Sequence, residues 1–230
     1  MRPITLTVIG LSLIFFVTCD FPQPPQIITV SSPSPMKPSK PSDIQTPGEA
    51  IAVIMTVGRK NLGLPVVNPI QLLLYKNNAS FASYGQGWRT LPIDVDDLTA
   101  FTQGNKIHIN LAKTGGKKWG ALISLLAHEY THAIEAAVAK RYTSSWFGEG
   151  FASWIAAKTV HALGWQDYSV TFERAKFELI NSQPLPTFND MAWNWKALRH
   201  ASNGFIKTYV LAFVAVDRLV TKGGFSATMQ

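Results

Sequence analysis

The spacing of apolar and polar residues predicts strands in the first part of the chain and helices in the second. Residues 106–111 alternate between apolar and polar side chains, which is typical of a strand with one buried face. Residues 71–75 form a short apolar run between turn-forming residues and are also expected to be a strand. Residues 80–103 contain two glycines and a proline, so strands joined by loops are expected there.

Helical spacing occurs once in the first part, over residues 49–61, and dominates after residue 117. The later helices are expected at residues 117–141, 148–162, 169–181 and 202–222. Strands followed by helices are typical of the α+β class. Residues 48–230 are therefore expected to form a single α+β domain.

The N-terminal residues follow a different pattern. Residues 4–18 carry no charge and are rich in large apolar side chains, but they are fewer than the about 20 residues that a membrane-spanning helix needs. Cys19 ends this run and resembles the lipid-modified cysteine of bacterial lipoproteins. We expect residues 1–19 to be a signal and the protein to be extracytoplasmic, anchored to the membrane through a lipid on Cys19. An ordinary cleaved signal, leaving a secreted protein, or an uncleaved N-terminal signal-anchor is the alternative.

Residues 20–47 are expected to be a linker. Eight of the fourteen prolines and five serines lie between residues 21 and 47. Proline lacks the backbone N–H and fixes φ, so this segment is expected to be extended and to form neither a helix nor a strand ladder. A proline motif bound by another protein is the alternative.

Composition narrows the classes of function. The chain is 47% hydrophobic and 15% charged, which predicts a folded core rather than disorder. Its single cysteine excludes an intramolecular disulfide framework and any multi-cysteine metal site. Lysine and arginine exceed the acids by 21 to 14, but they are scattered. The densest group, Lys113, Lys117 and Lys118, is interpreted as a solvated turn, so no nucleic-acid partner is expected.

The residues best suited to chemistry lie in His128-Glu129-Tyr130-Thr131-His132. Positions i and i+4 of a helix share one face, so the two imidazoles could bind one zinc ion. Glu129 is turned by about 100° from His128 and could reach a zinc-bound water without ligating the metal. The surrounding apolar residues predict a buried helix, in which such a cluster is costly unless it has a partner such as a metal.

A third metal ligand is expected on the next helix. A catalytic zinc site has three protein ligands and an open position for water. Glu149 is the candidate, because a short connection would bring the start of its helix near His132, and Gly148 and Gly150 permit close approach. The alternative for Glu149 is a carboxylate that stabilises the first turn of a helix.

The remaining histidines are not assigned to the metal. His108 is on the polar face of its predicted strand and is interpreted as a surface residue. His161 and His200 have no spacing typical of ligands.

The HExxH motif followed by Trp146-x-x-Glu149-Gly150-x-Ala152 resembles the gluzincin metallopeptidases, the group of thermolysin and the aminopeptidase N-like enzymes. The closest likeness is to compact bacterial members of that group, the peptidase MA-like families. This resemblance implies a zincin, thermolysin-like catalytic domain. In that fold a small mixed sheet packs on the active-site helix, and a helical C-terminal part follows.

The resemblance also implies residue roles. One Zn²⁺ per chain would be held by His128, His132 and Glu149, with Glu129 as the general base. Tyr209 matches the tyrosine of the family's downstream helix that donates to the oxyanion, and the alternative is a core tyrosine. The family's Gly-x-Met-x-Asn signature for a free amine is absent, which argues against aminopeptidase activity.

The sequence therefore predicts a zinc-dependent peptidase that acts on peptides or proteins in the cell envelope. By the same resemblance, strand 106–111 would be the edge strand that pairs with an extended substrate. The alternative is a zinc-binding envelope module of the same fold with weak or no peptidase activity, serving binding or assembly. Glu129 argues against that alternative, since a binding module has no use for a general base.

Overall fold

The computed structural model describes residues 22–33, 38–86, 98–138, 144–201, 203–204 and 206–224. The predicted signal and Cys19 lie outside the described residues. Among the helices that are described, none combines the length and the apolar character needed to cross a membrane.

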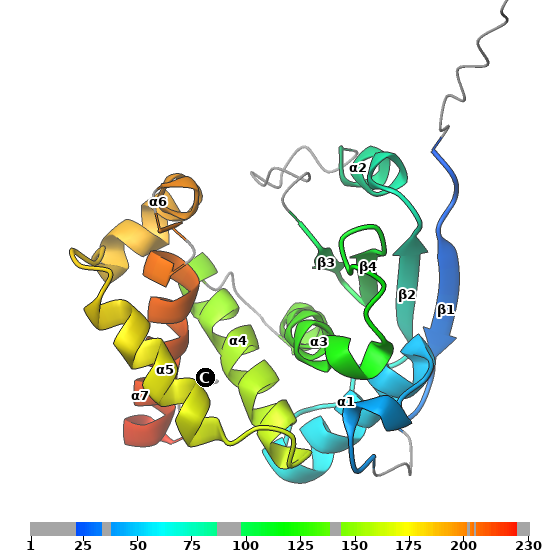
Figure 1. The fold of residues 1–230 in the computed structure, drawn as a ribbon, viewed down its shortest axis with the longest axis horizontal. Helices are drawn as coiled ribbons and strands as arrows, with labels where there is room; N and C mark the ends of the chain where they lie inside the picture. Colours follow the sequence, from blue (N-terminus) through cyan, green and yellow to red (C-terminus); the bar gives the residue numbers. More distant parts are fainter. Residues whose placement is uncertain are drawn as a thin grey trace, which may run out of the picture.

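The sheet has four strands in the order β1-β2-β4-β3 (Figure 1). Strand β1 (Gln26–Val30) runs antiparallel to β2 (Ile70–Tyr75), which is parallel to β4 (Lys106–Asn110). Strand β3 (Ala100–Gln103) is antiparallel to β4 and forms the edge nearest the helical part of the molecule. The sheet is thus small and mixed.

Helices cover both faces of the sheet. Alternate residues of β2 and β4 contribute to the main core beneath α1 (Pro47–Leu62) and α3 (Ile123–Val138). The opposite face forms a smaller apolar cluster with Phe81 of α2 (Asn78–Gln86). Helix α3 is preceded by a 3₁₀ turn, η3 (Trp119–Leu122), which contacts a second one, η1 (Pro41–Asp43).

The C-terminal part is helical. It comprises α4 (Ser145–Ala162), α5 (Tyr168–Ile180), α6 (Phe188–His200), a π-helical turn η4 (Ile206–Val210) and α7 (Leu211–Gly223). Helix α4 lies between α3 and α7 (Figure 1). It meets α7 closely at Gly150, where an added Cβ would lie 2.5 Å from the carbonyl oxygen of Ala212. The α+β class and the order of sheet followed by helices are therefore as expected.

The expectation that residues 20–47 contain no strand is wrong for Gln26–Val30. These five residues hold no proline and include four consecutive β-branched side chains, and they pair along β2. The prolines lie on either side of this run. The high proline content of residues 21–47 as a whole therefore did not apply to the short segment that forms the strand.

Two helices were not expected. Helix α2 replaces part of the strands predicted for residues 80–103, and Asn77 accepts a hydrogen bond from the backbone N–H of Ser80 at its start (2.8 Å). Helix α6 begins with a capping box formed by Thr187 and Asp190. Both start signals are present in the sequence, but the sequence analysis did not predict a helix from either of them. The single helix predicted over 202–222 is in fact the turn η4 followed by α7.

Two predictions about strand β4 are also wrong. It lies between β2 and β3, so it is an interior strand, and the edge strand is β3. His108 is not a surface residue, because α2 covers its face of the sheet and leaves the side chain 3% exposed. Its ring stacks on Phe101 (4.3 Å between centroids), and its Nδ1 lies 2.8 Å from the hydroxyl of Tyr75.

Candidate metal centre and cleft

The two histidines of the HExxH motif and Glu149 converge at the contact between α3 and α4. His128 Nε2 lies 3.1 Å from His132 Nε2 and 3.1 Å from Glu149 Oε2, and His132 Nε2 lies 3.7 Å from the same oxygen. In a tetrahedral site with bonds of about 2.0–2.1 Å, ligand atoms are separated by about 3.4 Å. The three side chains therefore already have the spacing of metal ligands and could hold an ion.

The pKa values of this cluster reflect its mutual hydrogen bonds. Burial alone would raise the pKa of Glu149, but hydrogen bonds from His128 and His132 outweigh burial and hold it well below its usual range. Burial alone would lower the pKa of His132, but hydrogen bonds to Glu135 and Glu149 hold it well above its usual range. A bound cation would replace the proton that these groups share.

Both imidazoles are supported on the side away from Glu149. His132 Nδ1 lies 2.8 Å from Glu135 Oε2, one turn further along α3. His128 Nδ1 lies 3.4 Å from the hydroxyl of Ser153, one turn beyond Glu149 on α4. Such partners fix the ring orientation of a metal-binding histidine. The sequence analysis missed both residues, although their spacing of i+3 from His132 and i+4 from Glu149 would have indicated them.

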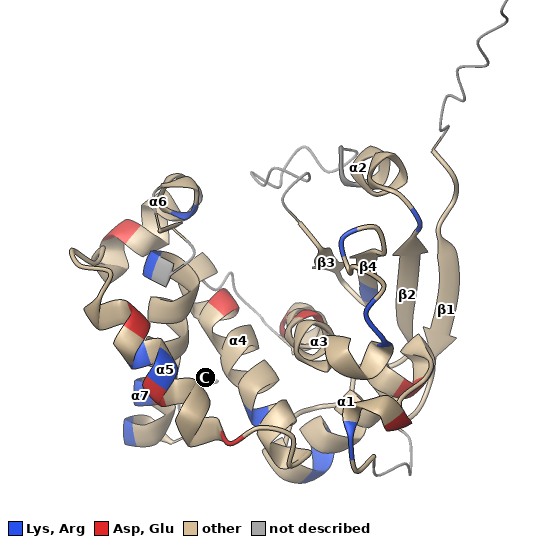
Figure 2. Ribbon diagram, in the orientation of Figure 1, with Lys and Arg blue, Asp and Glu red and all other residues tan. Residues whose placement is uncertain are grey.

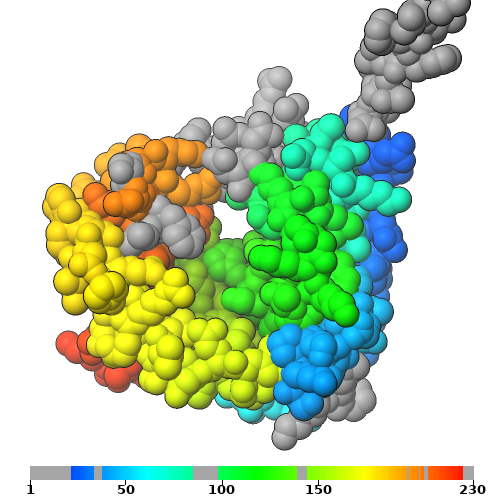
Figure 3. All heavy atoms as spheres, in the orientation of Figure 1, coloured from blue at the N-terminus to red at the C-terminus, as the bar shows by residue number. Residues whose placement is uncertain are grey.

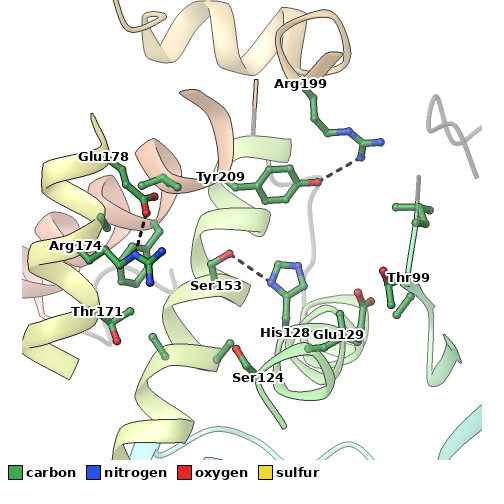
Figure 4. Close-up of a pocket in the computed structure, with 18 of the residues that line it drawn as sticks. Thr99, Ser124, His128, Glu129, Ser153, Thr171, Arg174, Glu178, Arg199 and Tyr209 are labelled. Carbon is green, nitrogen blue, oxygen red and sulfur yellow. Dashed lines mark hydrogen bonds and ion pairs between the residues drawn. The ribbon is translucent and has the colours of Figure 1, made fainter. Parts of the chain in front are cut away.

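Glu129 is held by the edge strand. Its side chain is 6% exposed, and its Oε2 lies 2.7 Å from the hydroxyl of Thr102 on β3. The same hydroxyl is 2.9 Å from the backbone carbonyl oxygen of Glu129. The carboxylate is therefore fixed between His128 and the side of β3, as Figure 4 shows. Thr102 is 27 residues away in sequence and had no signal that could have indicated this contact.

The site opens into a cleft of about 760 Å³. Its walls are α3 with His128 and Glu129, the start of β3 with Thr99 and Ala100, and residues of α4 to α7. Figure 3 shows a hollow between the orange and green parts of the surface, and Figure 4 shows the side chains that line it. The candidate metal ligand His128 thus faces a space that could admit an extended molecule.

Tyr209 lines the same cleft. It belongs to η4, and its ring points towards the side where His128 lies (Figure 4). Its hydroxyl accepts a hydrogen bond from Nη1 of Arg199 (3.4 Å). Burial raises the pKa of Tyr209 to about 12, so the phenol keeps its proton at neutral pH. The structure therefore brings Tyr209 together with His128 and Glu129 on one cleft, as a donor requires.

The two histidines without ligand spacing differ in position. His161 Nδ1 accepts a hydrogen bond from the backbone N–H of Tyr168 (3.2 Å) at the start of α5. His200 is exposed at the end of α6 and lines the cleft. Proximity to the cleft could not have been inferred for His200, because it depends on how α6 packs against α4.

Comparisons of the chain with family models, with curated proteins and with solved structures found no match. The resemblance to the gluzincins therefore rests on the motif residues of the sequence.

Proposed function

We propose that this protein is a zinc-dependent peptidase of the gluzincin type with a zincin, thermolysin-like fold. The observation that carries the proposal is the convergence of His128, His132 and Glu149, with His128 and Glu129 lining an open cleft. Two imidazoles and one carboxylate form a donor set that suits Zn²⁺ and leaves a coordination position for water. A structural zinc site would more often have four protein ligands.

The residues around the ion have complementary roles in this proposal. Bound Zn²⁺ would lower the pKa of a coordinated water and polarise the carbonyl of the scissile bond. Glu129 takes the proton of the attacking water and later delivers it to the leaving amine. Tyr209 donates a hydrogen bond from its hydroxyl to the carbonyl oxygen as negative charge develops there. Thr102 keeps the carboxylate of Glu129 in place while Glu129 takes up the proton from water and delivers it to the amine.

The edge strand β3 offers a template for the substrate backbone. Asn110 N donates to the carbonyl oxygen of Thr99 (2.9 Å), so residues 99, 101 and 103 bond to β4. The N–H and C=O groups of Ala100 and Thr102 then point away from β4. An extended peptide could pair with these groups by strand addition, with its scissile bond next to Glu129. Strand β3 therefore replaces strand 106–111, which the sequence analysis had expected to be the edge strand that pairs with the substrate.

The proposed place of action is the cell envelope. It rests on the apolar run of residues 4–18 and on Cys19. Peptides or proteins outside the cytoplasm would then be the substrates.

A digest of a random peptide pool tests the proposal. The zinc-loaded protein should cleave the pool, a chelator should abolish cleavage, and added zinc should restore it. Glu129→Gln keeps the size of the side chain and its bond to Thr102 but removes the base. We expect this variant to retain zinc and thermal stability while hydrolysis falls at least about 10²-fold. Unchanged hydrolysis by Glu129→Gln would eliminate the mechanism, and no hydrolysis by the parent would favour a binding module.

A further inference from the structure

Two arginines line the cleft, and they differ in their partners. Arg174 on α5 forms an ion pair with Glu178, with 3.1 Å between its Nε and the carboxylate Oε1. Arg199 at the end of α6 has no carboxylate partner among the residues that the structure describes. Its hydrogen bond goes to the neutral hydroxyl of Tyr209 at 3.4 Å. Lys and Arg are spread over many elements in Figure 2, so this difference does not come from a general basic surface.

Most of the hydrogen-bond donors of Arg199 have no partner among the side chains that the structure describes. The residue is half-buried, and a guanidinium offers five N–H donors in a planar fork that matches a carboxylate. One long hydrogen bond to a phenol uses one of these donors and neutralises no charge. Arg199 lines the cleft, so its remaining donors are suited to an anion that enters from there.

The backbone holds Arg199 in this position. Gly204 lies against the end of α6, and a Cβ added there would be 2.2 Å from the carbonyl oxygen of Arg199. The N–H of Gly204 also donates to the carbonyl oxygen of Ala201 (2.8 Å). This tight turn leads directly into η4, which carries Tyr209. In Figure 4 the side chain of Arg199 extends from α6 over the cleft, on the side opposite Arg174.

Other charges of the cleft restrict where an anion can bind. Glu178 is neutralised by Arg174, whereas Glu129 lies deep beside the histidines. An anion near Glu129 would be repelled, and an anion near Arg199 would be attracted. A preference for negatively charged peptides in this cleft would therefore depend on where the negative group lies along the peptide.

We propose that Arg199 is a carboxylate-binding subsite that selects peptide substrates with a negative group beyond Tyr209. The inference rests on the proposed peptidase function. The carboxylate could belong to an aspartate or glutamate side chain or to the C-terminus of the substrate, since both present the same two oxygens to the guanidinium. Arg199 would then contribute to specificity and not to the chemical step.

Matched peptide pools test this inference. Each pool consists of decapeptides with neutral random positions. The first pool carries a single glutamate at each position in turn, and the second carries glutamine at the same positions; both have an amidated C-terminus. The third pool has only neutral residues and a free C-terminus. We expect the parent to cleave peptides with the negative group at one particular place at least about tenfold faster, in kcat/KM, than their neutral partners.

Variants assign the preference to one residue. Arg199→Gln should remove the preference, measured as the ratio of kcat/KM for each charged peptide to kcat/KM for its neutral partner. Arg199→Lys keeps the charge without the fork and should retain part of the preference. Arg174→Gln is the matched control, because it removes the other cleft arginine, and the preference should stay. A preference for glutamate alone or for the free C-terminus alone identifies the source of the carboxylate, and either supports the inference.

A binding measurement separates this inference from the peptidase proposal. Glu129→Gln and the double variant Glu129→Gln/Arg199→Gln are mixed with the pools, and retained peptides are counted by mass spectrometry. Enrichment of negatively charged peptides that the double variant loses supports the subsite, even if the parent hydrolyses nothing. Equal retention of charged and neutral peptides by Glu129→Gln overturns it. An equal loss of kcat on all pools in Arg199→Gln also overturns it, since Arg199 would then act by positioning Tyr209.

Discussion

Each imidazole of the candidate metal centre has one nitrogen near Glu149 and the other near a supporting side chain. Glu135 fixes the ring of His132, and Ser153 lies beside the ring of His128. The ligand atoms therefore need little movement to surround an ion. Such preorganisation reduces the conformational entropy that metal binding has to overcome.

Glu149→Ala tests the third ligand. Two imidazoles alone leave the ion open to solvent, so we expect zinc affinity to fall more than about 100-fold, the upper end for supporting residues. The measurement is zinc content after dialysis against a mild chelator. Glu173→Ala is the control, because Glu173 is an exposed carboxylate of α5. Full zinc occupancy in Glu149→Ala would show that the ligand assignment is wrong.

Tyr209→Phe tests the oxyanion donor. The change removes one hydroxyl and almost no volume, so a structural tyrosine should tolerate it. Loss of an oxyanion donor costs about 10²–10³ in kcat. We expect kcat and kcat/KM to fall together while KM and zinc content stay constant. An effect confined to KM or to melting temperature would return Tyr209 to a structural role, and His200 would be the next donor to test.

At the scale of elements, three contacts position the site. Helix α3 supplies both histidines and Glu129, α4 supplies Glu149, and β3 holds Glu129 through Thr102. Gly150 lets α4 lie close against α7, which begins directly after the turn that carries Tyr209. The site thus depends on the packing of helices from both parts of the molecule.

The contact of α2 with the sheet predicts a pH dependence of stability. Burial, aided by the charge of Lys106, lowers the pKa of His108 from 6.5 to about 4. The unfolded chain binds this proton at higher pH than the folded chain does. The stability is therefore present above about pH 6.5 and is lost as the pH falls towards 4, by on the order of 3 kcal/mol at most.

Urea unfolding between pH 7 and pH 4 measures this effect. His108→Gln can still accept a hydrogen bond from Tyr75 but has no ionisable group. Its unfolding free energy should decrease less steeply over this range than that of the parent. All other titratable groups are common to the two proteins, so parallel curves would mean that His108 does not contribute.

At the scale of the whole molecule, the cleft lies between the sheet with α3 and the helical C-terminal part. The sheet side carries the proposed general base and substrate template, whereas the helical side carries Tyr209 and Arg199. A bound peptide would contact both sides. Movement of one part relative to the other would then change the distance between Glu129 and Tyr209.

Cys19→Ser tests the proposed location. A lipid on Cys19 would bind the membrane through burial of its chains, at about 0.8 kcal/mol per CH₂. The variant should lose lipid labelling and move from the membrane to the soluble extracytoplasmic fraction, or remain uncleaved. Fractionation of the complete chain beside the parent measures this. Equal distribution would favour an ordinary signal or a helical anchor.

Local sequence was sufficient for several helices and for residues whose spacing carries chemistry. The ranges of α1, α4 and α5 agree with the predicted ones within a few residues. The grouping of His128, His132 and Glu149 followed from the i, i+4 geometry of one helix and a short connection to the next. The identity of the metal and the peptidase activity stay predictions.

Long-range packing decided what the sequence could not. Strand β1 exists because β2 offers it a partner, and His108 is buried because α2 happens to cover its face. Which strand forms the edge depends on pairing order, and pairing order has no signal within a single strand. Thr102 contacts Glu129 although the two residues are far apart in the chain. Arg199 lies beside Tyr209 although they belong to different helical elements. The sequence by itself determined the candidate ligands, because two of them are one turn apart on a helix and the third lies near the start of the next helix. Only the tertiary structure decided what surrounds them.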